Sequence, residues 1–393
     1  MSERKAFIRA CTDRRRTIAQ ICIEFGISEK TGYKVLRRFR KEHDELLEDR
    51  SHAVLHHPFR IPGEVKEKIL SLKLAHPQYG PQTIHDWLIQ NEPGQRWPAA
   101  SSIGEILKRN GLVNQHRKRD RNAERAHLNS SLTKASEPNL VWTADFKGQF
   151  RLGRGSGKYC YPLTVMDLNS RFILCLKGLE TTAIHETRRE FTRIFREYGL
   201  PRVIRTDNGV PFAQHNSIGR LGQLAFWWVR LGIKPEHIRP GRPGENGAHE
   251  RFHRTLKDTA TRPSSQSMKP QQERFDAFRV EYNTLRPHRS LKERRPPKHF
   301  YSSSERSFPE HLPPIVYPDG ALMRRVSSCG FIKWRGQEIF ISANIAGSYV
   351  GIFEVASEEG SDELSVRFAN MQLGLLDLDT KTLKPEVRWI EPI

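Results

Sequence analysis

Three short acidic segments constrain the fold of this chain more than any other feature. Asp145 lies within residues 140–150, a β-prone run in which apolar and polar residues alternate. Asp207 closes a second β-prone run that begins at residue 203, and an Asn-Gly turn signal follows it. Glu250 lies near the start of a segment with helical composition that continues to about residue 258. A fold that brings these two strands and this helix to one point would gather three carboxylates there.

Carboxylate oxygens are the ligands that hard divalent cations such as Mg²⁺ take. A pair of such ions about 3.5–4 Å apart activates an attacking oxygen and stabilises a leaving oxygen in phosphoryl transfer. Each acidic segment alone is weak evidence, because Asp-Asn-Gly is usually only a turn and a lone helical Glu is usually only solvated. Their order and context strengthen the interpretation. Asp207 follows Asp145 by 62 residues, Glu250 follows 43 residues later, and Lys257 lies seven residues beyond it.

The residues around the three acids form a recognisable series. They are Trp142-Thr143-Ala144-Asp145, then Thr206-Asp207-Asn208-Gly209-Val210-Pro211-Phe212, then Asn246-Gly247-x-x-Glu250-Arg251-Phe252-His253-Arg254-Thr255-Leu256-Lys257. The series resembles the retroviral-type integrase core found in the acidic-triad transposases of bacterial insertion sequences. The resemblance covers residues 138–301 closely and the flanks more loosely. It departs from the commonest pattern in the run Pro243-Gly244-Glu245-Asn246, where many relatives carry a Gln after the Pro, and in the long gap between Asp207 and Glu250.

This resemblance implies a ribonuclease-H-like α/β core in which Asp145, Asp207 and Glu250 are both the catalytic residues and the metal ligands. It implies two Mg²⁺ ions per site, for which Mn²⁺ can substitute. The implied partners are the terminal inverted repeats of the element and a target DNA, bound by a homo-oligomer. Within the helix of Glu250, Arg254 and Lys257 lie at i+4 and i+7 and share its face. With Asn246, these two are the expected DNA contacts of the core.

The first 50 residues predict a helix-turn-helix domain. Expected helices cover residues 3–11, 17–25 and 29–40, and Gly26-Ile27-Ser28 forms the turn and the N-cap of the third. The third helix is expected to bury Val35, Leu36 and Phe39 and to enter the major groove of DNA. The alternative is an ordinary three-helix bundle with a solvated basic face. The candidate DNA-contacting residues of this helix are Lys30, Thr31, Lys34, Arg37 and Arg38.

Further domains are expected on both sides of the integrase-like core of residues 138–301. Residues 60–115 predict a second helical, helix-turn-helix-like domain, with a last helix over 101–110 that Ser101 or Ser102 caps. Residues 116–137 form a basic linker, which is either solvated or follows a phosphate backbone. Six β-prone runs at regular spacing within 320–380 predict a small all-β barrel, with either a DNA-binding or a purely structural role.

The charge of the chain favours a polyanionic partner. Its 65 Lys and Arg residues outnumber 45 Asp and Glu residues, which gives a formal net charge of +20. Nucleic acid is the default candidate, because neutralising phosphates releases counterions. No apolar stretch approaches 18 residues and no apolar signal core follows the first residues, so we expect a cytoplasmic, nucleoid-associated protein without a membrane contact. The five cysteines are scattered without a Cys-x-x-Cys pair, which argues against a zinc knuckle.

The sequence therefore predicts a multidomain DNA transposase, a metal-dependent polynucleotidyl transferase. It would cleave at the element ends and transfer the resulting 3′-hydroxyl into target DNA. One alternative is a domesticated DNA-binding regulator with an inactive core. Another is a metal-dependent nuclease that cuts without joining. The presence of all three acidic residues argues against the inactive core.

Overall fold

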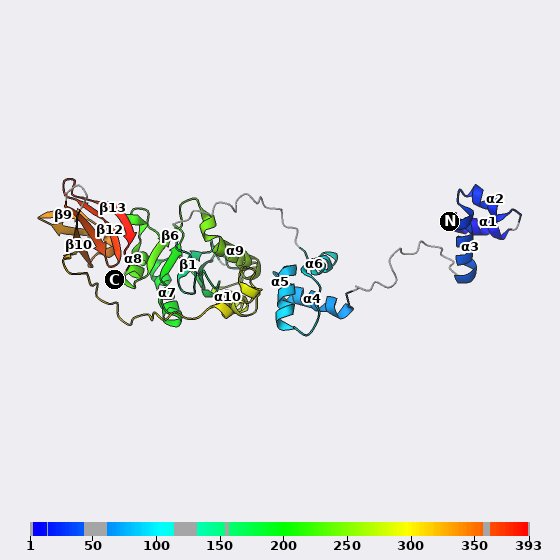
Figure 1. The fold of residues 1–393 in the computed structure, drawn as a ribbon, viewed down its shortest axis with the longest axis horizontal. Coiled ribbons are helices and arrows are strands. Elements are labelled where there is room, and N and C mark those ends of the chain that lie inside the picture. Colours follow the sequence, from blue (N-terminus) through cyan, green and yellow to red (C-terminus); the bar gives the residue numbers. More distant parts are fainter. Residues whose placement is uncertain are drawn as a thin grey trace. The chain divides into compact units, whose positions relative to one another are not determined.

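The structure is a computed structural model that describes residues 3–13, 15–42, 61–113, 132–153, 157–356 and 362–391. It divides into two compact units, Met1–Ile61 and Pro62–Ile393. Most of the predicted basic linker lies outside the described residues. Figure 1 shows the ribbon coloured along the sequence, with many of the helices and strands labelled.

The N-terminal unit contains three helices, α1 (Glu3–Thr12), α2 (Ile18–Glu24) and α3 (Glu29–Glu42). Ser28 caps α3 as predicted, because its Oγ accepts the Thr31 backbone N–H at 3.3 Å. Gly32 is the point of closest packing, since a Cβ there would collide with Cys22 Sγ and the Phe7 ring. The prediction that Phe39 is buried is wrong. Its side chain is 38% exposed and lies outside the core that Phe7, Ile8, Ile21, Cys22 and Leu36 form.

The second unit begins with α4 (Gly63–Ala75), α5 (Pro81–Asn91) and α6 (Ala100–Arg109). Ile69, Ile84, Leu88 and Ile103 are fully buried in this helical module. The predicted serine cap of α6 is wrong. The helix begins at residue 100, so its N-cap is Ala99 and both serines lie inside the first turn.

A mixed β-sheet forms the centre of the second unit. β4, β3, β1, β5 and β6 follow one another across the sheet, and β2 pairs with the start of β3. β3 is antiparallel to both β1 and β4, whereas β1, β5 and β6 are parallel. This arrangement is the hairpin-then-crossover order expected for a ribonuclease-H-like core. The strands are β1 (Val141–Phe146), β2 (Phe150–Arg151), β3 (Tyr159–Asp167), β4 (Ile173–Leu179), β5 (Val203–Thr206) and β6 (Lys234–His237).

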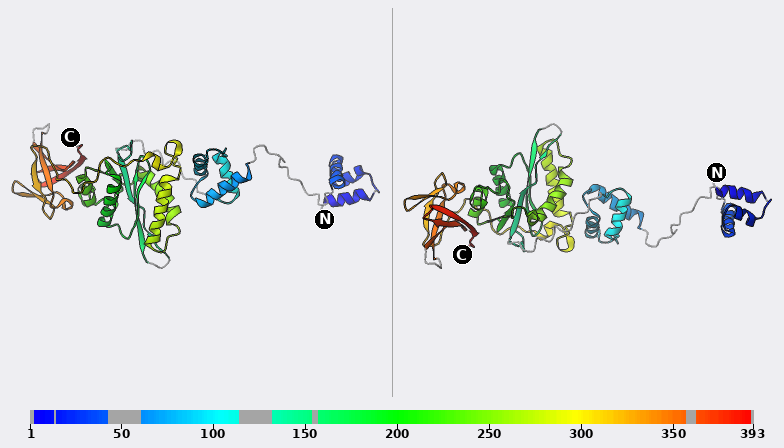
Figure 2. Two further views of the ribbon diagram at one scale, coloured as in Figure 1. Left: turned by 90° about the horizontal axis from the view of Figure 1, so that it is seen from below. Right: turned by 90° about the horizontal axis from the view of Figure 1, so that it is seen from above.

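Helices cover both faces of this sheet (Figure 2). Along β3, Leu163 and Val165 pack with α7 (Ile184–Tyr198) and α8 (Gln223–Arg230) in one cluster. Cys160 and Met166 point to the opposite face and pack with α9 (Gly247–Leu256) and α10 (Met268–Thr284). Alternation along a strand is what divides its side chains between two such layers.

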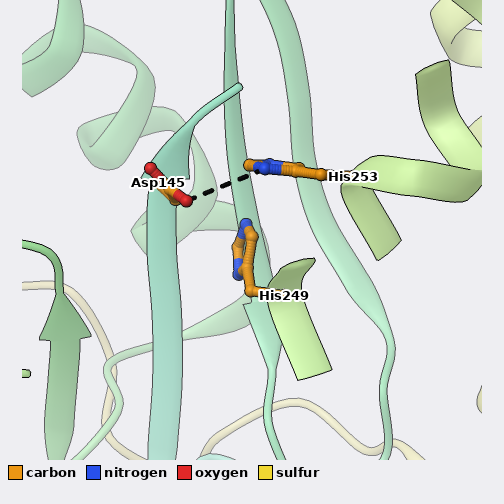
Figure 3. A group of neighbouring side chains, drawn as sticks. All are labelled: Asp145, His249 and His253. Carbon is orange, nitrogen blue, oxygen red and sulfur yellow. Dashed lines mark ion pairs between the residues drawn. The ribbon is translucent and has the colours of Figure 1, made fainter. Parts of the chain in front are cut away.

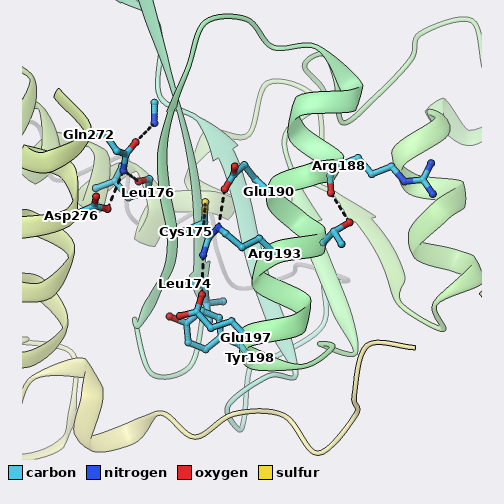
Figure 4. A network of polar contacts seen from close by, with 12 residues as sticks. Leu174, Cys175, Leu176, Arg188, Glu190, Arg193, Glu197, Tyr198, Gln272 and Asp276 are labelled. Carbon is cyan, nitrogen blue, oxygen red and sulfur yellow. Dashed lines mark hydrogen bonds and ion pairs between the residues drawn. The ribbon is translucent and has the colours of Figure 1, made fainter. Parts of the chain in front are cut away.

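The outer strand β4 is held by both flanking layers (Figure 4). The Gln272 side chain of α10 accepts the Gly178 N–H at 2.9 Å and donates to the Leu176 carbonyl at 3.0 Å. On the other face, Arg193 of α7 donates to Cys175 Sγ at 3.7 Å and also pairs with Glu190 and Glu197. The two Gln272 bonds satisfy backbone groups that an uncovered edge strand would expose, whereas Arg193 contacts a β4 side chain.

The C-terminal part of the chain is rich in β-structure. β13, β12, β11, β10 and β7 form a five-stranded sheet, and β8 and β9 form a separate pair. The closed barrel stays a prediction. β13 was not predicted, because Pro385 lies within it; the strand tolerates proline because it is at the sheet edge. The strands are β7 (Leu322–Arg325), β8 (Phe331–Trp334), β9 (Gln337–Phe340), β10 (Tyr349–Ala356), β11 (Asp362–Phe368), β12 (Met371–Asp377) and β13 (Thr382–Trp389).

Short helical turns connect these elements: η2 (Ile218–Arg220), η3 (Pro243–Asn246), η4 (Lys257–Thr261), η5 (Lys292–Arg294), η6 (Pro297–Phe300) and η7 (Ala343–Ile345). Across the described ranges, the helices are too short or too polar to cross a membrane.

Candidate active site

The register of two parallel strands brings Asp145 and Asp207 to the same edge of the sheet. β1 and β5 are neighbours, and Ala144 pairs with Thr206. The next residue along each strand direction is Asp145 on one side and Asp207 on the other. Ligand and active sites of parallel sheets collect at this carboxyl end of the strands. The backbone pairing of β1 with β5 therefore brings Asp145 and Asp207 to one edge of the sheet, as the acidic segments predicted.

The loop after Asp207 is fixed by hydrogen bonds. Asp207 Oδ1 accepts the Gly209 backbone N–H at 3.1 Å. The Asn208 side chain donates to the Ile238 carbonyl at 2.7 Å and accepts from Arg220 at 3.3 Å. A Cβ on residue 209 would lie 3.0 Å from Asp207 Oδ2, so glycine gives the carboxylate room. The Asn-Gly turn thus holds the Asp207 carboxylate in place.

Glu250 enters the site from the first turn of α9 and is exposed. Glu245, the other acid of this segment, does not compete for the same role. Its side chain is almost fully buried and accepts both the backbone N–H and the Nε–H of Arg239, at 2.8 and 2.6 Å. Glu245 therefore closes the turn between β6 and α9, and Glu250 is left at the surface.

The three predicted acids influence one another electrostatically. Burial, followed by the negative charges of Asp207 and Glu250, raises the pKa of Asp145 to about 7. A pair of like charges in a half-buried place disfavours the ionised form of both. Bound divalent cations would offset this repulsion, and carboxylate oxygens are the donors that Mg²⁺ prefers. The carboxylates are donors of the right type for such ions, but in the described residues the ligand atoms that lie within 4.8 Å of one another belong to Asp145, His249 and His253, so the three-acid ligand set stays a prediction.

Two histidines of α9 also belong to the site, and the sequence analysis did not predict them (Figure 3). His249 is fully buried, and His253 Nδ1 lies 3.7 Å from Asp145 Oδ2. Burial lowers the pKa of both imidazoles; for His253, burial and the charge of Lys147 lower the pKa to about 3. One atom from each of Asp145, His249 and His253 lies within 4.8 Å of the others. Their i, i+4 spacing beside Glu250 was the only signal available in the sequence.

The predicted DNA contacts of the core lie on and around α9. Arg254 is exposed, and Lys257 opens the π-helical turn η4 directly after the helix. Burial lowers the pKa of Lys147, and the positive charges of Lys257 and Arg262 add to the effect, so these three cations lie within electrostatic reach of one another. Asn246 is 5% exposed, so little of its side chain is open to a ligand. Its role as a DNA contact stays a prediction.

The predicted contacts of the N-terminal unit lie on α3. Lys30, Thr31, Lys34 and Arg37 are exposed, whereas Arg38 is half-buried. The Thr31 hydroxyl lies 2.9 Å from Ser28 Oγ and so takes part in the cap. The helix presents a basic surface, which is what a phosphate-binding helix requires.

Comparisons with known protein families agree with this geometry. Two models described as integrase core domains match residues 135–243 and 231–297. A homeodomain-like domain matches residues 31–107, and a helix-turn-helix domain matches residues 3–53. The core matches enclose Asp145, Asp207 and Glu250, and both helix-turn-helix matches include α3.

Similar sequences come from viruses and from a bacterial insertion element. The chain is 28% identical over 131 residues to a Pol polyprotein of Feline endogenous virus ECE1 and 30% identical over 130 residues to a Gag-Pol polyprotein of Baboon endogenous virus (strain M7). These alignments cover 33% of this chain, but only 12% and 7% of the viral polyproteins. An uncharacterized 39.2 kDa protein of insertion element IS476 from Xanthomonas euvesicatoria is 26% identical over 272 residues, which are 63% of this chain and 68% of that protein.

The integrase core matches, the helix-turn-helix match and the insertion-element relative together support an insertion-sequence transposase of the retroviral-integrase-like superfamily. Solved structures similar to this chain include the HTLV-2 integrase catalytic core domain in complex with magnesium, with 16% identity, a TM-score of 0.34, and coverage of 43% of this chain and 100% of that one. A simian T-cell lymphotropic virus intasome in complex with PP2A regulatory subunit B56 gamma has 15% identity, a TM-score of 0.36, and coverage of 82% of this chain and 95% of that one.

Proposed function

We propose that this transposase cleaves DNA at the ends of its element and joins the released 3′-hydroxyl to target DNA, in a reaction that depends on Mg²⁺. The observation that carries the proposal is the meeting of Asp145 and Asp207 at the end of two paired strands, within electrostatic reach of Glu250. Phosphoryl transfer is catalysed mostly by positioning the reacting groups and stabilising their charge. Divalent cations would do both, and such a carboxylate cluster would supply their binding site.

Asp145, Asp207 and Glu250 would hold two Mg²⁺ ions, for which Mn²⁺ can substitute. The ions supply charge stabilisation for the attacking and the leaving oxygen. Water attacks the phosphodiester at each element end and leaves a 3′-hydroxyl, which then attacks a phosphodiester of the target. Arg254 and Lys257 bind the phosphates on either side of the reacting bond. The reaction needs no covalent bond to the protein, so no Ser or Tyr nucleophile is required.

The helical modules would provide DNA recognition. The exposed basic surface of α3 is proposed to enter the major groove of the terminal inverted repeats. Target DNA would be bound with less sequence selectivity, through phosphate contacts that the charge of +20 favours. Because two element ends must meet at one target, we propose that the transposase acts as a homo-oligomer on DNA.

The test is a cleavage and joining assay with the full chain, Mg²⁺ and DNA that carries the element ends. We expect Asp145→Asn, Asp207→Asn and Glu250→Gln each to abolish both products while end binding in a gel shift is retained. A single variant with near-normal joining would remove that carboxylate from the proposed site. Cleavage without joining in the wild type would instead indicate a nuclease, and end binding without either product would indicate a regulator with an inactive core.

A further inference from the structure

The hydrogen-bonding capacity of one buried hydroxyl determines the state of the two active-site histidines. Thr164 Oγ1 has three polar neighbours: the Asp145 carbonyl at 2.8 Å, His249 Nε2 at 2.6 Å and His253 Nε2 at 2.8 Å. A hydroxyl has one proton to donate and two lone pairs that accept. The Asp145 carbonyl can only accept. Thr164 must therefore donate its proton to this carbonyl. Otherwise two acceptor oxygens would lie 2.8 Å apart with no proton between them.

Both imidazoles must therefore donate an Nε2–H to the two lone pairs of Thr164. For His249, this leaves Nδ1 as an acceptor. The Thr143 hydroxyl lies 2.8 Å from Nδ1 and 3.4 Å from the Met166 carbonyl, so its proton goes to the nearer nitrogen. Both ring nitrogens of His249 are then used, and its ring is fully buried. His249 is accordingly a positioning residue that links α9 to β1 and β3.

His253 differs from His249 because, among the residues that the structure describes, no hydroxyl donates to its second nitrogen as Thr143 does to that of His249. With the proton on Nε2, Nδ1 carries a lone pair, and this lone pair lies 3.7 Å from Asp145 Oδ2. Two acceptor atoms face one another at a separation that is too long for a hydrogen bond. Two acceptors at this separation suit a cation between them, since bonds of about 2.0–2.2 Å would meet at an angle of roughly 120°.

We propose that His253 Nδ1 is a metal ligand, and that with Asp145 it gives this carboxylate site a nitrogen donor that makes it prefer Mn²⁺ and related transition ions over Mg²⁺. The inference rests on the proposed function, because it assigns an additional ligand to the same cation site. Imidazole nitrogen binds first-row transition ions, whereas Mg²⁺ keeps oxygen ligands and water. An all-carboxylate site would lack this selectivity.

Two substitutions separate the role of each ring nitrogen. The amide nitrogen of His253→Gln can reach the position of Nε2 and still donate to Thr164, but nothing replaces Nδ1. The shorter His253→Asn keeps a polar atom near the position of Nδ1 and loses the donor to Thr164. His185→Gln provides a matched control, because His185 is exposed on α7.

The experiment is pulsed electron paramagnetic resonance of Mn²⁺ bound to the full-length protein, with calorimetric titration of Mn²⁺ and Mg²⁺. We expect the wild type and His185→Gln to show a ¹⁴N coupling from a directly bound imidazole. His253→Gln should lose the coupling and bind Mn²⁺ at least about tenfold more weakly, since even indirect partners of a metal cost 10–100-fold. Its Mg²⁺ affinity should change by less than about threefold, because Mg²⁺ prefers oxygen ligands. His253→Asn should bind Mn²⁺ without the coupling.

Mn²⁺ bound to the wild type without a ¹⁴N coupling would overturn the proposal, and so would unchanged Mn²⁺ affinity in His253→Gln. The first of these outcomes does not depend on whether any variant folds. Failure of the proposed function has a different result, namely joining that survives Asp145→Asn. A wild type that cleaves and joins DNA but shows no coupling would refute the nitrogen ligand alone.

Discussion

The carboxylates of the candidate site are held in two different ways. Asp145 and Asp207 are placed by the backbone, because the β1–β5 ladder pairs the residues immediately before them. Glu250 is exposed on α9, and that helix is attached to the sheet through apolar packing and the side-chain bonds of His249 to Thr143 and Thr164. The strand side of the site, Asp145 and Asp207, is therefore placed by the topology of the sheet. The helix side, Glu250 on α9, is placed by a few buried side chains.

The largest expected effect is a loss of catalysis without a loss of stability, on substitution of Asp145 on the strand side. Asp145→Asn should lower the joining rate at least about a thousandfold, because metal-ion stabilisation is worth several kcal/mol. Without divalent cations, its melting temperature should equal or exceed that of the wild type, since a buried charge near Asp207 and Glu250 is removed. Paired activity and melting measurements test this. A large loss of stability would mean that Asp145 holds the fold together.

A second substitution tests how firmly β5 is held. Arg205 donates to Glu236 of β6 at 2.7 Å and to the Thr133 carbonyl at 2.6 Å, and both charged side chains are almost fully buried. Arg205→Met leaves Glu236 buried without its cation, which should cost about 3–5 kcal/mol in the free energy of unfolding.

Chemical denaturation measures that loss, and the double variant Arg205→Met/Glu236→Met should recover much of it. Arg295→Met is the control, because the side chains of Arg295 and its partner Glu293 are 52% and 58% exposed and their ion pair should contribute under about 1 kcal/mol. If Arg205→Met lowers the free energy of unfolding no more than this control does, the buried Arg205–Glu236 pair does not hold β5 in place.

On the helix side, Thr164→Val keeps the shape of the side chain but removes the hydroxyl that serves both imidazoles. Two buried N–H donors then lose their acceptor, which should cost about 1–3 kcal/mol. We also expect slower joining, because α9 is no longer fixed to β3. Thr192→Val is the matched control: its hydroxyl only bonds to the Arg188 carbonyl at 2.9 Å in an exposed place. Equal joining rates in both variants would contradict a positioning role for the network.

The smallest effect concerns the DNA rather than the fold. Lys257→Ala should weaken binding of the element end by up to about tenfold and reduce the salt dependence by about one charge. Lys257→Arg should recover part of the loss, since the charge survives although the geometry differs. A crosslinker at residue 257 should label terminal nucleotides, and labelling confined to distant DNA would place this lysine outside the site.

The sequence predicted the strand side well, because its information is local. Alternation around Asp145 and the turn after Asp207 are both visible within ten residues. The helix-turn-helix was likewise predicted from short-range patterns, whereas the ribonuclease-H-like core was implied by the resemblance of the acidic segments to the integrase family.

The histidine network could not be predicted in the same way. His249 meets Thr143 and Thr164 across 106 and 85 residues of sequence, and only the β1–β3 register places those threonines side by side. Phe39 was misassigned because helical periodicity shows which residues share a face and not how far the neighbouring helices extend along it. Tertiary packing, rather than local pattern, decides both cases.

Iron-directed cleavage of the protein tests most directly whether the two sides meet at one cation site. Fe²⁺ would be bound to the full-length chain in place of Mg²⁺, and ascorbate with peroxide would generate hydroxyl radicals that cut the backbone near the ion. The account predicts fragments that end near residues 145, 207 and 250, all suppressed by excess Mg²⁺. Cuts near 145 and 207 without any near 250 would show that Glu250 does not share the site, and would contradict the central claim.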